Sequence, residues 1–117
     1  MMPTANSQPT DIDEITNLLI SFRDQRNWAQ FHNSKDLALA LSIEAAELNE
    51  LFLWKSAGEV DEAKLRDELA DVFAFAFLLA HKHGFKVREI VESKVRKNAE
   101  KYPVHKAHST ARKYNEL

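Results

Sequence analysis

The stretch DELADVFAFAFLLA, residues 67–80, decides the fold of this chain. Its last nine residues, Val72 to Ala80, are apolar at every position. A helix has about 3.6 residues per turn, so such a run points apolar side chains in all directions. Helices of this kind are buried on several sides. The stretch therefore predicts a helix that lies in a bundle core or a subunit interface.

The sequence around this stretch predicts three further helices and no strand. The first begins at Asp11, since Asp11 and Glu14 have the spacing of a capping box. Gly84 and Pro103 are the expected stops of the third and fourth helices. The expected helices cover residues 11 to about 25, about 35–54, about 61–83 and about 87–101, with residues 26–34 as a loop. The fold class is therefore all-α, with a four-helix-bundle subunit.

Length and composition indicate one small domain. The chain has 117 residues, no cysteine and a formal net charge of -2. We expect a disordered segment over residues 1–10, a helical catalytic domain over 11–103 and a polar tail over 104–117. The charge predicts no nucleic-acid partner, and the apolar runs are too short for a membrane span. With no recognisable signal peptide, a cytoplasmic protein is the simplest interpretation.

Two pairs of acidic residues are candidate metal ligands. Glu44 and Glu47 are three residues apart on the second expected helix, and Glu68 and Asp71 are three apart on the third. Residues at this spacing share one helix face. Antiparallel helices would bring the two pairs together among apolar neighbours. Converging carboxylates repel each other, and a divalent cation relieves the repulsion.

An all-oxygen ligand set favours Mg²⁺, with Mn²⁺ as an alternative, over zinc. Magnesium keeps coordination positions open for water and phosphate oxygens, so its natural ligand is a polyphosphate. The alternative is that these acids are solvated or cap helices. Glu50 and Asp67 lie nearby, and surface charge is their default interpretation.

Aromatic and basic residues are candidate substrate contacts. Trp28 and His32 lie in the loop before the acidic helix, and Trp54 closes that helix. Aromatic rings stack on nucleobases, but they also serve as core residues. Lys94 and Asn98 share a face of the fourth helix, where a lysine can bind phosphate or simply be solvated. The residues alone leave both alternatives open.

Taken together, the motifs resemble those of the MazG-like all-α nucleoside triphosphate pyrophosphohydrolases, and more closely the dCTP pyrophosphatase branch. The similar segments are R-x-W-x-x-F-H (26–32), A-L-x-x-E-x-x-E-L-x-E-L-F-x-W-K (40–55), D-E-L-A-D-V (67–72), K-x-x-x-N-x-x-x-Y-P (94–103) and A-x-K-Y-x-E-L (111–117). The resemblance covers nearly the whole chain after residue 10.

The resemblance implies a subunit that assembles as a homodimer or homotetramer. It implies magnesium on the four carboxylates. It also implies a base pocket formed by Trp28, His32 and Trp54, with Lys94 and Asn98 on the phosphate or sugar. Two positions depart from some relatives, which have a tyrosine at Phe75 and a histidine at Leu19. These departures put the base preference in question and leave the metal ligands unchanged.

The expected function is Mg²⁺-dependent hydrolysis of nucleoside triphosphates, with dCTP and modified cytosine deoxynucleotides as expected substrates. Water attacks the α-phosphorus and pyrophosphate leaves, which cleanses the nucleotide pool. The water loses its proton either because the metal polarises it or because one glutamate accepts the proton as general base. Two alternatives are a non-catalytic helical interaction module and a di-metal redox protein. The redox alternative needs Glu-x-x-His pairs, whereas residues 47 and 71 are Glu and Asp.

Overall fold

The computed structural model describes residues 8–117, and these residues form helices and turns without a strand. The part of the expected disordered segment that covers residues 1–7 lies outside the described residues. The described chain divides into two compact units, residues up to Gly84 and residues from Phe85 onward. No helix in residues 8–117 is long and apolar enough to cross a membrane.

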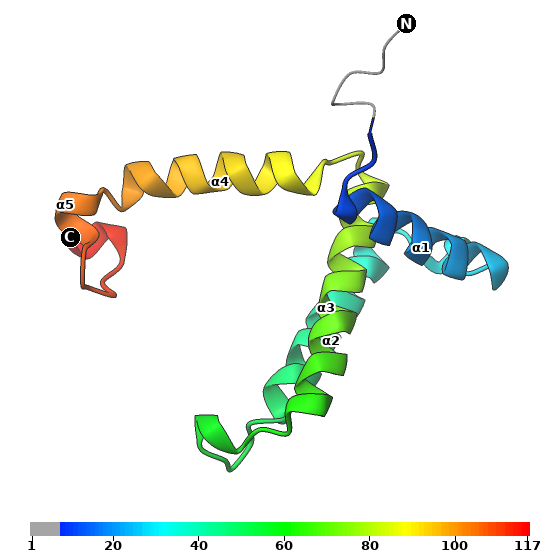
Figure 1. Ribbon diagram of the computed structural model, residues 1–117, viewed down its shortest axis with the longest axis horizontal. Coiled ribbons are helices and arrows are strands. Elements are labelled where there is room, and N and C mark those ends of the chain that lie inside the picture. The colour runs from blue at the N-terminus through cyan, green and yellow to red at the C-terminus, as the bar shows by residue number, and fades with distance from the viewer. Residues whose placement is uncertain (1–7) are drawn as a thin grey trace, which may run out of the picture. The chain divides into compact units, whose positions relative to one another are not determined.

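The first unit contains three long helices and two short 3₁₀ turns. They are α1 (Asp11–Gln25), η2 (Ala29–Phe31), α2 (Ser34–Glu50), η3 (Ala57–Glu59) and α3 (Glu62–Lys82). Both α1 and α2 pack against α3, and α2 and α3 run side by side as a hairpin (Figure 1). The all-helical prediction is confirmed. The packing of a fourth helix into one bundle stays a prediction.

The ends of these helices follow local hydrogen-bonding rules. Asp61 caps α3 by accepting hydrogen bonds from the backbone N–H groups of residues 63 and 64. Gly84 follows α3 with a φ of 69°, a left-handed conformation that favours glycine. The predicted cap of α1 is wrong by one residue. Thr10 is the N-cap and Asp13 completes its capping box, because a threonine hydroxyl directly before the helix serves the same purpose.

The second helix is shorter than expected. It ends at Glu50 rather than near Trp54, and residues 51–55 form turns. In these turns Trp54 has a φ of 62°, which is uncommon for a bulky residue. The backbone is no longer helical here, so the turn determines the position of Trp54. The helical periodicity of α2 does not extend to this residue.

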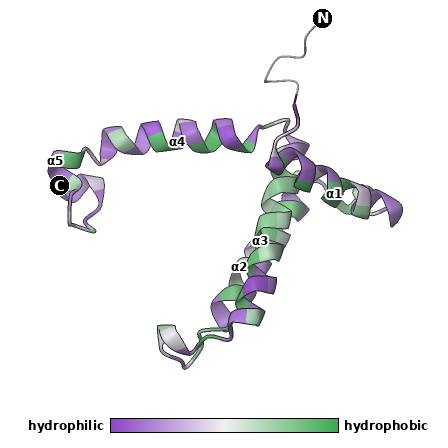
Figure 2. Ribbon diagram, in the orientation of Figure 1, coloured by the Kyte–Doolittle hydropathy of each residue, from purple (hydrophilic) through white to green (hydrophobic). Residues whose placement is uncertain are grey.

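The core of the first unit lies where α2 begins and α3 ends. Leu37 is 2% exposed, and Leu78 and Ala80 are also buried. The hydroxyl of Ser34 and Nε2 of His83 lie 2.8 Å apart in a hydrogen bond that ties these two helix ends together. The apolar second half of α3 (Figure 2) supplies this core. However, Phe73 remains 51% exposed, so the apolar run is only partly covered within one chain.

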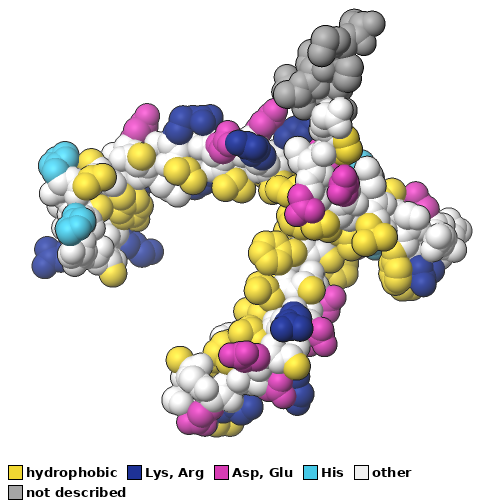
Figure 3. Space-filling view, viewed as in Figure 1, with side chains coloured by type: hydrophobic (Ala, Val, Ile, Leu, Met, Phe, Trp, Pro, Cys, Tyr) yellow, Lys and Arg dark blue, Asp and Glu magenta, His cyan; other side chains and the backbone are white. Residues whose placement is uncertain are grey.

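The second unit consists of α4 (Val87–Lys101), α5 (Val104–Ala107) and the turn η4 (Tyr114–Glu116). The predicted bounds of the fourth helix are confirmed. The polar tail contains α5 and η4, and the Tyr102 and Tyr114 rings meet edge to face at 6.2 Å. Hydrophobic side chains line one side of α4 (Figure 3). Ile90, Val91 and Val95 are exposed residues of this helix.

Candidate metal and nucleotide site

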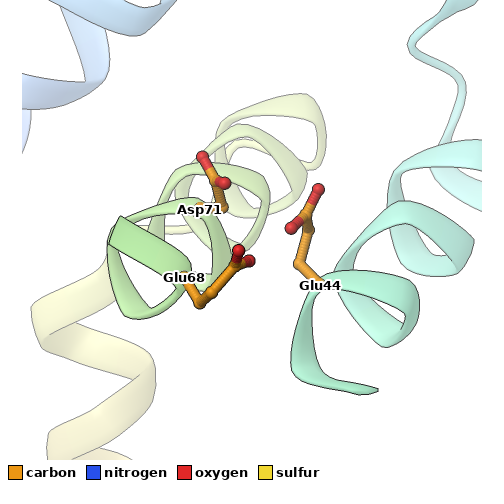
Figure 4. Close-up of side chains that lie close together, drawn as sticks. All are labelled: Glu44, Glu68 and Asp71. Atoms are coloured by element: carbon orange, nitrogen blue, oxygen red, sulfur yellow. The ribbon is translucent and has the colours of Figure 1, made fainter. Parts of the chain in front are cut away.

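A group of carboxylates meets across the α2–α3 hairpin. Glu44 extends from α2, and Glu68 and Asp71 extend from α3 into the same space (Figure 4). One carboxylate oxygen from each of the three lies within 4.8 Å of the others. Helix periodicity explains this arrangement, because each pair shares one helix face and the hairpin turns those faces toward each other. We call these three residues the acidic cluster.

Two oxygens of the acidic cluster have no hydrogen-bond partner. Oε2 of Glu44 and Oε2 of Glu68 are both buried and unpaired. A buried polar atom without a partner costs free energy, and a buried charge costs more. A cation between the helices would satisfy both oxygens at once. The donors of the cluster are therefore suited to a hard divalent ion.

The protonation of Glu44 reflects the same crowding. Burial, a hydrogen bond with Glu47 and the negative charge of Glu47 raise the pKa of Glu44 to about 7. The charges of Asp71 and Glu68 raise it further. The crowding of carboxyl groups therefore favours the protonated form of Glu44 in the metal-free protein.

Glu47 belongs to this electrostatic environment although its oxygens fall outside the acidic cluster. Burial is the main cause that raises the pKa of Glu68, and the charge of Glu47 comes second. The charge of Asp71 and a hydrogen bond with Glu47 follow. The structure thus brings together three of the four predicted ligands and places the fourth beside them. The role of each as a ligand stays a prediction.

His32 lies against the helical core at the other end of α2 from Trp54. Its ring meets the ring of Phe75 edge to face at 6.5 Å. Burial, followed by the charge of Arg23, lowers the pKa of His32, so its imidazole is neutral at physiological pH. Its Nδ1 atom is buried and unpaired. A neutral ring with an unpaired nitrogen can hydrogen-bond to a ligand.

The two tryptophans are not brought together within one chain. Trp28 precedes α2 and is 44% exposed, whereas Trp54 follows α2 and is 93% exposed. The 17 residues of α2 span about 25 Å between them. A pocket that uses both indoles therefore needs a surface from a second chain.

Lys94 and Asn98 lie one helical turn apart on α4, in the second unit. Lys94 is exposed and Asn98 is half-buried. The predicted shared face is confirmed by the continuous helix, while contact with a substrate stays a prediction. Arg26 begins the R-x-W-x-x-F-H motif but was not among the predicted site residues, and its side chain stacks on the ring of Phe22. The spacing of four residues between them was the available signal.

An all-helical chain with an acidic cluster across a helical hairpin defines a class of candidate metal-dependent proteins. A sequence model of the MazG-like family matches residues 39–117 of this chain. Human dCTP pyrophosphatase 1 is 39% identical over 94% of this chain and 69% of its own length. The rat dCTP pyrophosphatase 1 is 36% identical over 98% of this chain and 72% of its own length.

A solved structure agrees with these sequence relatives. The crystal structure of a pyrophosphatase from Archaeoglobus fulgidus superimposes with a TM-score of 0.77 at 32% identity. The match covers 88% of this chain and 99% of the archaeal one. The chain therefore belongs to the MazG-like family, and the resemblance seen in its motifs is confirmed.

Proposed function

We propose that this protein hydrolyses nucleoside triphosphates to the monophosphate and pyrophosphate, with dCTP and modified cytosine deoxynucleotides as substrates. Membership of the MazG-like family and relatives named dCTP pyrophosphatase 1 place it among the nucleoside triphosphate pyrophosphohydrolases. Removal of unwanted cytosine nucleotides from the cytoplasmic pool is the role that fits this activity. The acidic cluster, with its two unpaired carboxylate oxygens, is the observation that supports the proposal most directly.

The residues that would hold the metal are Glu44, Glu68 and Asp71, with Glu47 beside them. Their oxygens suit Mg²⁺, and Mn²⁺ is a second choice. A bound divalent cation would neutralise the triphosphate and make a nearby water more acidic. The α2–α3 hairpin brings three of these carboxylates within 4.8 Å of one another without a substrate.

The proposed hydrolytic step uses these residues. Water forms a bond to the α-phosphorus, the bond from that phosphorus to the bridging oxygen breaks, and pyrophosphate leaves. A carboxylate of the hairpin accepts the proton of the water as general base. Trp28 and Trp54 stack on the base and His32 donates or accepts a hydrogen bond there. Lys94 and Asn98 bind the phosphate or sugar.

The assembly that completes this site is a homodimer or homotetramer. Trp28 and Trp54 lie at opposite ends of α2, so each base pocket would take one indole from each of two chains. The exposed apolar side chains of α3 and α4 give such an assembly its surface.

The experiment that tests this function measures pyrophosphate release from a panel of ribo- and deoxynucleoside triphosphates. We expect release from dCTP in the presence of Mg²⁺, none in EDTA, and recovery when Mg²⁺ is restored. Release from no nucleotide would favour the non-catalytic module. Full activity in EDTA would rule out the metal. Visible absorbance after addition of Fe²⁺ and air would instead support the redox alternative.

A further inference from the structure

Three side chains form a stacked group at the end of α1. The Cζ atom of Arg26 lies 3.6 Å from the centroid of the Phe22 ring and 5.9 Å from that of the Trp28 ring. The two rings meet edge to face, with centroids 5.8 Å apart and planes at 71°. The guanidinium therefore contacts the face of one ring and lies within cation–π distance of the other.

Backbone geometry fixes this group in place. Nη1 of Arg26 donates a hydrogen bond of 2.9 Å to the carbonyl oxygen of Phe22. Asn27 has a φ of 54°, a left-handed conformation that reverses the chain directly after α1. The backbone N–H of Trp28 then donates to the carbonyl oxygen of Arg23 at 3.0 Å. The turn thus returns Trp28 to the last turn of α1, beside Arg26.

The side chain of Trp28 needs this support because it is only half covered. Trp28 is 44% exposed, and its ring meets the Phe22 ring edge to face and is not stacked on it. A half-exposed side chain loses conformational entropy when it binds, and that loss weakens binding. A neighbour that restricts the indole beforehand lowers this cost.

We propose that Arg26 is a positioning residue for Trp28, which holds the indole in one orientation for stacking on the nucleobase. The proposal rests on the proposed function, in which Trp28 stacks on the base. Arg26 acts through Trp28 and need not contact the substrate. The residue determines how strongly the base is bound, and the chemical step is left unchanged.

Arginine is suited to this position and lysine is not equivalent. The planar guanidinium can lie flat on the Phe22 ring and still donate an N–H to the carbonyl oxygen of Phe22. A lysine ammonium is a compact charge without a plane, so it cannot make both contacts in the same way. The variant Arg26→Lys should therefore be intermediate between the wild type and Arg26→Met, which keeps the aliphatic bulk and removes the charge and plane.

Fluorescence anisotropy tests the positioning directly. The chain has 2 tryptophans, so a Trp54→Phe protein reports on Trp28 alone. In that background we expect Arg26→Met to lower the steady-state anisotropy of Trp28 and to raise its quenching by acrylamide. The control is Gln25→Met, at the exposed neighbouring position, which should change neither. Circular dichroism confirms that each variant keeps its helices. Unchanged anisotropy and quenching in both Arg26→Met and Arg26→Lys would overturn the proposal.

Kinetics in the chain with both tryptophans give the second readout. We expect Arg26→Met to raise KM for dCTP by about three- to tenfold, the size expected for one lost cation–π contact. The kcat should change less than about twofold, since the contact is not made to the reacting atoms. In a Trp28→Ala background, Arg26→Met should have no further effect on KM. Additive effects, or a loss in kcat in place of KM, would contradict the positioning role.

The two tests separate this proposal from the proposed function. If Trp28→Ala leaves KM unchanged, base stacking by Trp28 is wrong, and the anisotropy of Trp28 still decides whether Arg26 positions the ring. If Trp28→Ala raises KM and Arg26→Met does not, the stacking stands and the positioning role is wrong.

Discussion

The acidic cluster and the two tryptophans differ in how much of the site a single chain completes. One oxygen each from Glu44, Glu68 and Asp71 lies within 4.8 Å of the others in the α2–α3 hairpin. Trp28 and Trp54 lie at opposite ends of α2, and Trp54 is 93% exposed. The proposed metal-binding half of the site therefore comes together within one helical hairpin, and the proposed base-binding half does not.

This difference shows what a helical hairpin can and cannot assemble. Neighbouring antiparallel helices bring together residues at the same level, so two pairs at a spacing of three meet without further help. Residues at opposite ends of a helix stay a helix length apart. The two tryptophans can therefore form one pocket only with the surface of a second chain. Substitutions in the acidic cluster and at the tryptophans test the two proposed halves of the site separately.

The largest effect is expected from the acidic cluster. Asp71→Asn keeps the shape of the side chain and removes its charge, so it should weaken metal binding and lower kcat/KM. The loss should exceed the roughly 10- to 100-fold that removal of an outer-shell partner causes. Pyrophosphate release at saturating Mg²⁺ measures it.

The matched control for this prediction is Glu50→Gln on α2, outside the acidic cluster, which should retain activity. The metal-free Asp71→Asn protein should be as stable as the wild type or slightly more so, because one repulsive charge is gone. A large drop in its melting temperature in EDTA would identify Asp71 as a structural carboxylate instead.

The sequence was sufficient to predict the helices and the convergence of the carboxylates because both depend on local spacing. Gly84 and Pro103 stop helices through backbone conformation, and the bounds of α4 were predicted correctly. Pairs at a spacing of three fixed the faces of α2 and α3. These features need no knowledge of distant parts of the chain.

Other features depend on contacts that spacing does not encode. The end of α2 at Glu50 and the left-handed Trp54 reflect a turn whose residues have no strong signal for it. The cap at Thr10 was missed because Asp11 also has a suitable partner three residues later. The position of Trp28 beside Phe22 and Arg26 required the reversal of the chain at Asn27.

The second prediction tests the base-binding half. Trp28→Ala and Trp54→Ala should each raise KM for dCTP by an amount consistent with about 1–3 kcal/mol of lost stacking. Steady-state kinetics with dCTP measure the change, and Trp54→Phe, which keeps an aromatic ring, is the control with a smaller effect. Wild-type kinetics in both folded alanine variants would show that the indoles serve packing or assembly and do not bind the base.

The third prediction concerns the second chain that we propose for the base-binding half of the site. Phe73 is 51% exposed and Ile43 is 58% exposed on the α2–α3 hairpin, and an apolar surface of this kind favours a two-fold interface. We expect at least a dimer at micromolar concentration, with part of the Phe73, Phe75 and Phe77 set buried between subunits. Phe73→Glu should shift the mass toward the monomer and lower the activity several-fold.

Light scattering measures this assembly alongside activity. The control is Val104→Glu, a change at an exposed apolar position of the second unit, which should leave the mass unchanged. A fully active wild-type species at the monomer mass of 13.4 kDa would contradict the need for a second chain. The base-binding half would then have to form within one chain.

The smallest effect is expected in how the stability of the metal-free protein depends on pH. The pKa of Glu44 is raised from 4.5 to about 7 in the folded protein, so the folded state binds its proton more tightly than the unfolded state. Its contribution to the free energy of unfolding is therefore present below about pH 4.5 and is lost as the pH rises through about 7. The pKa of His32 is lowered, which changes stability with pH in the opposite direction.

Melting temperatures of the wild type and of Glu44→Gln, measured in EDTA across this pH range, separate the effect of Glu44 from that of His32. Only the wild type should lose the contribution of Glu44 to the free energy of unfolding between about pH 5 and pH 8. Added Mg²⁺ should stabilise the wild type more at the higher pH, since metal ligands must be deprotonated. If the melting temperatures of the two proteins depend on pH in the same way, Glu44 is not the carboxyl whose pKa is raised by its neighbours.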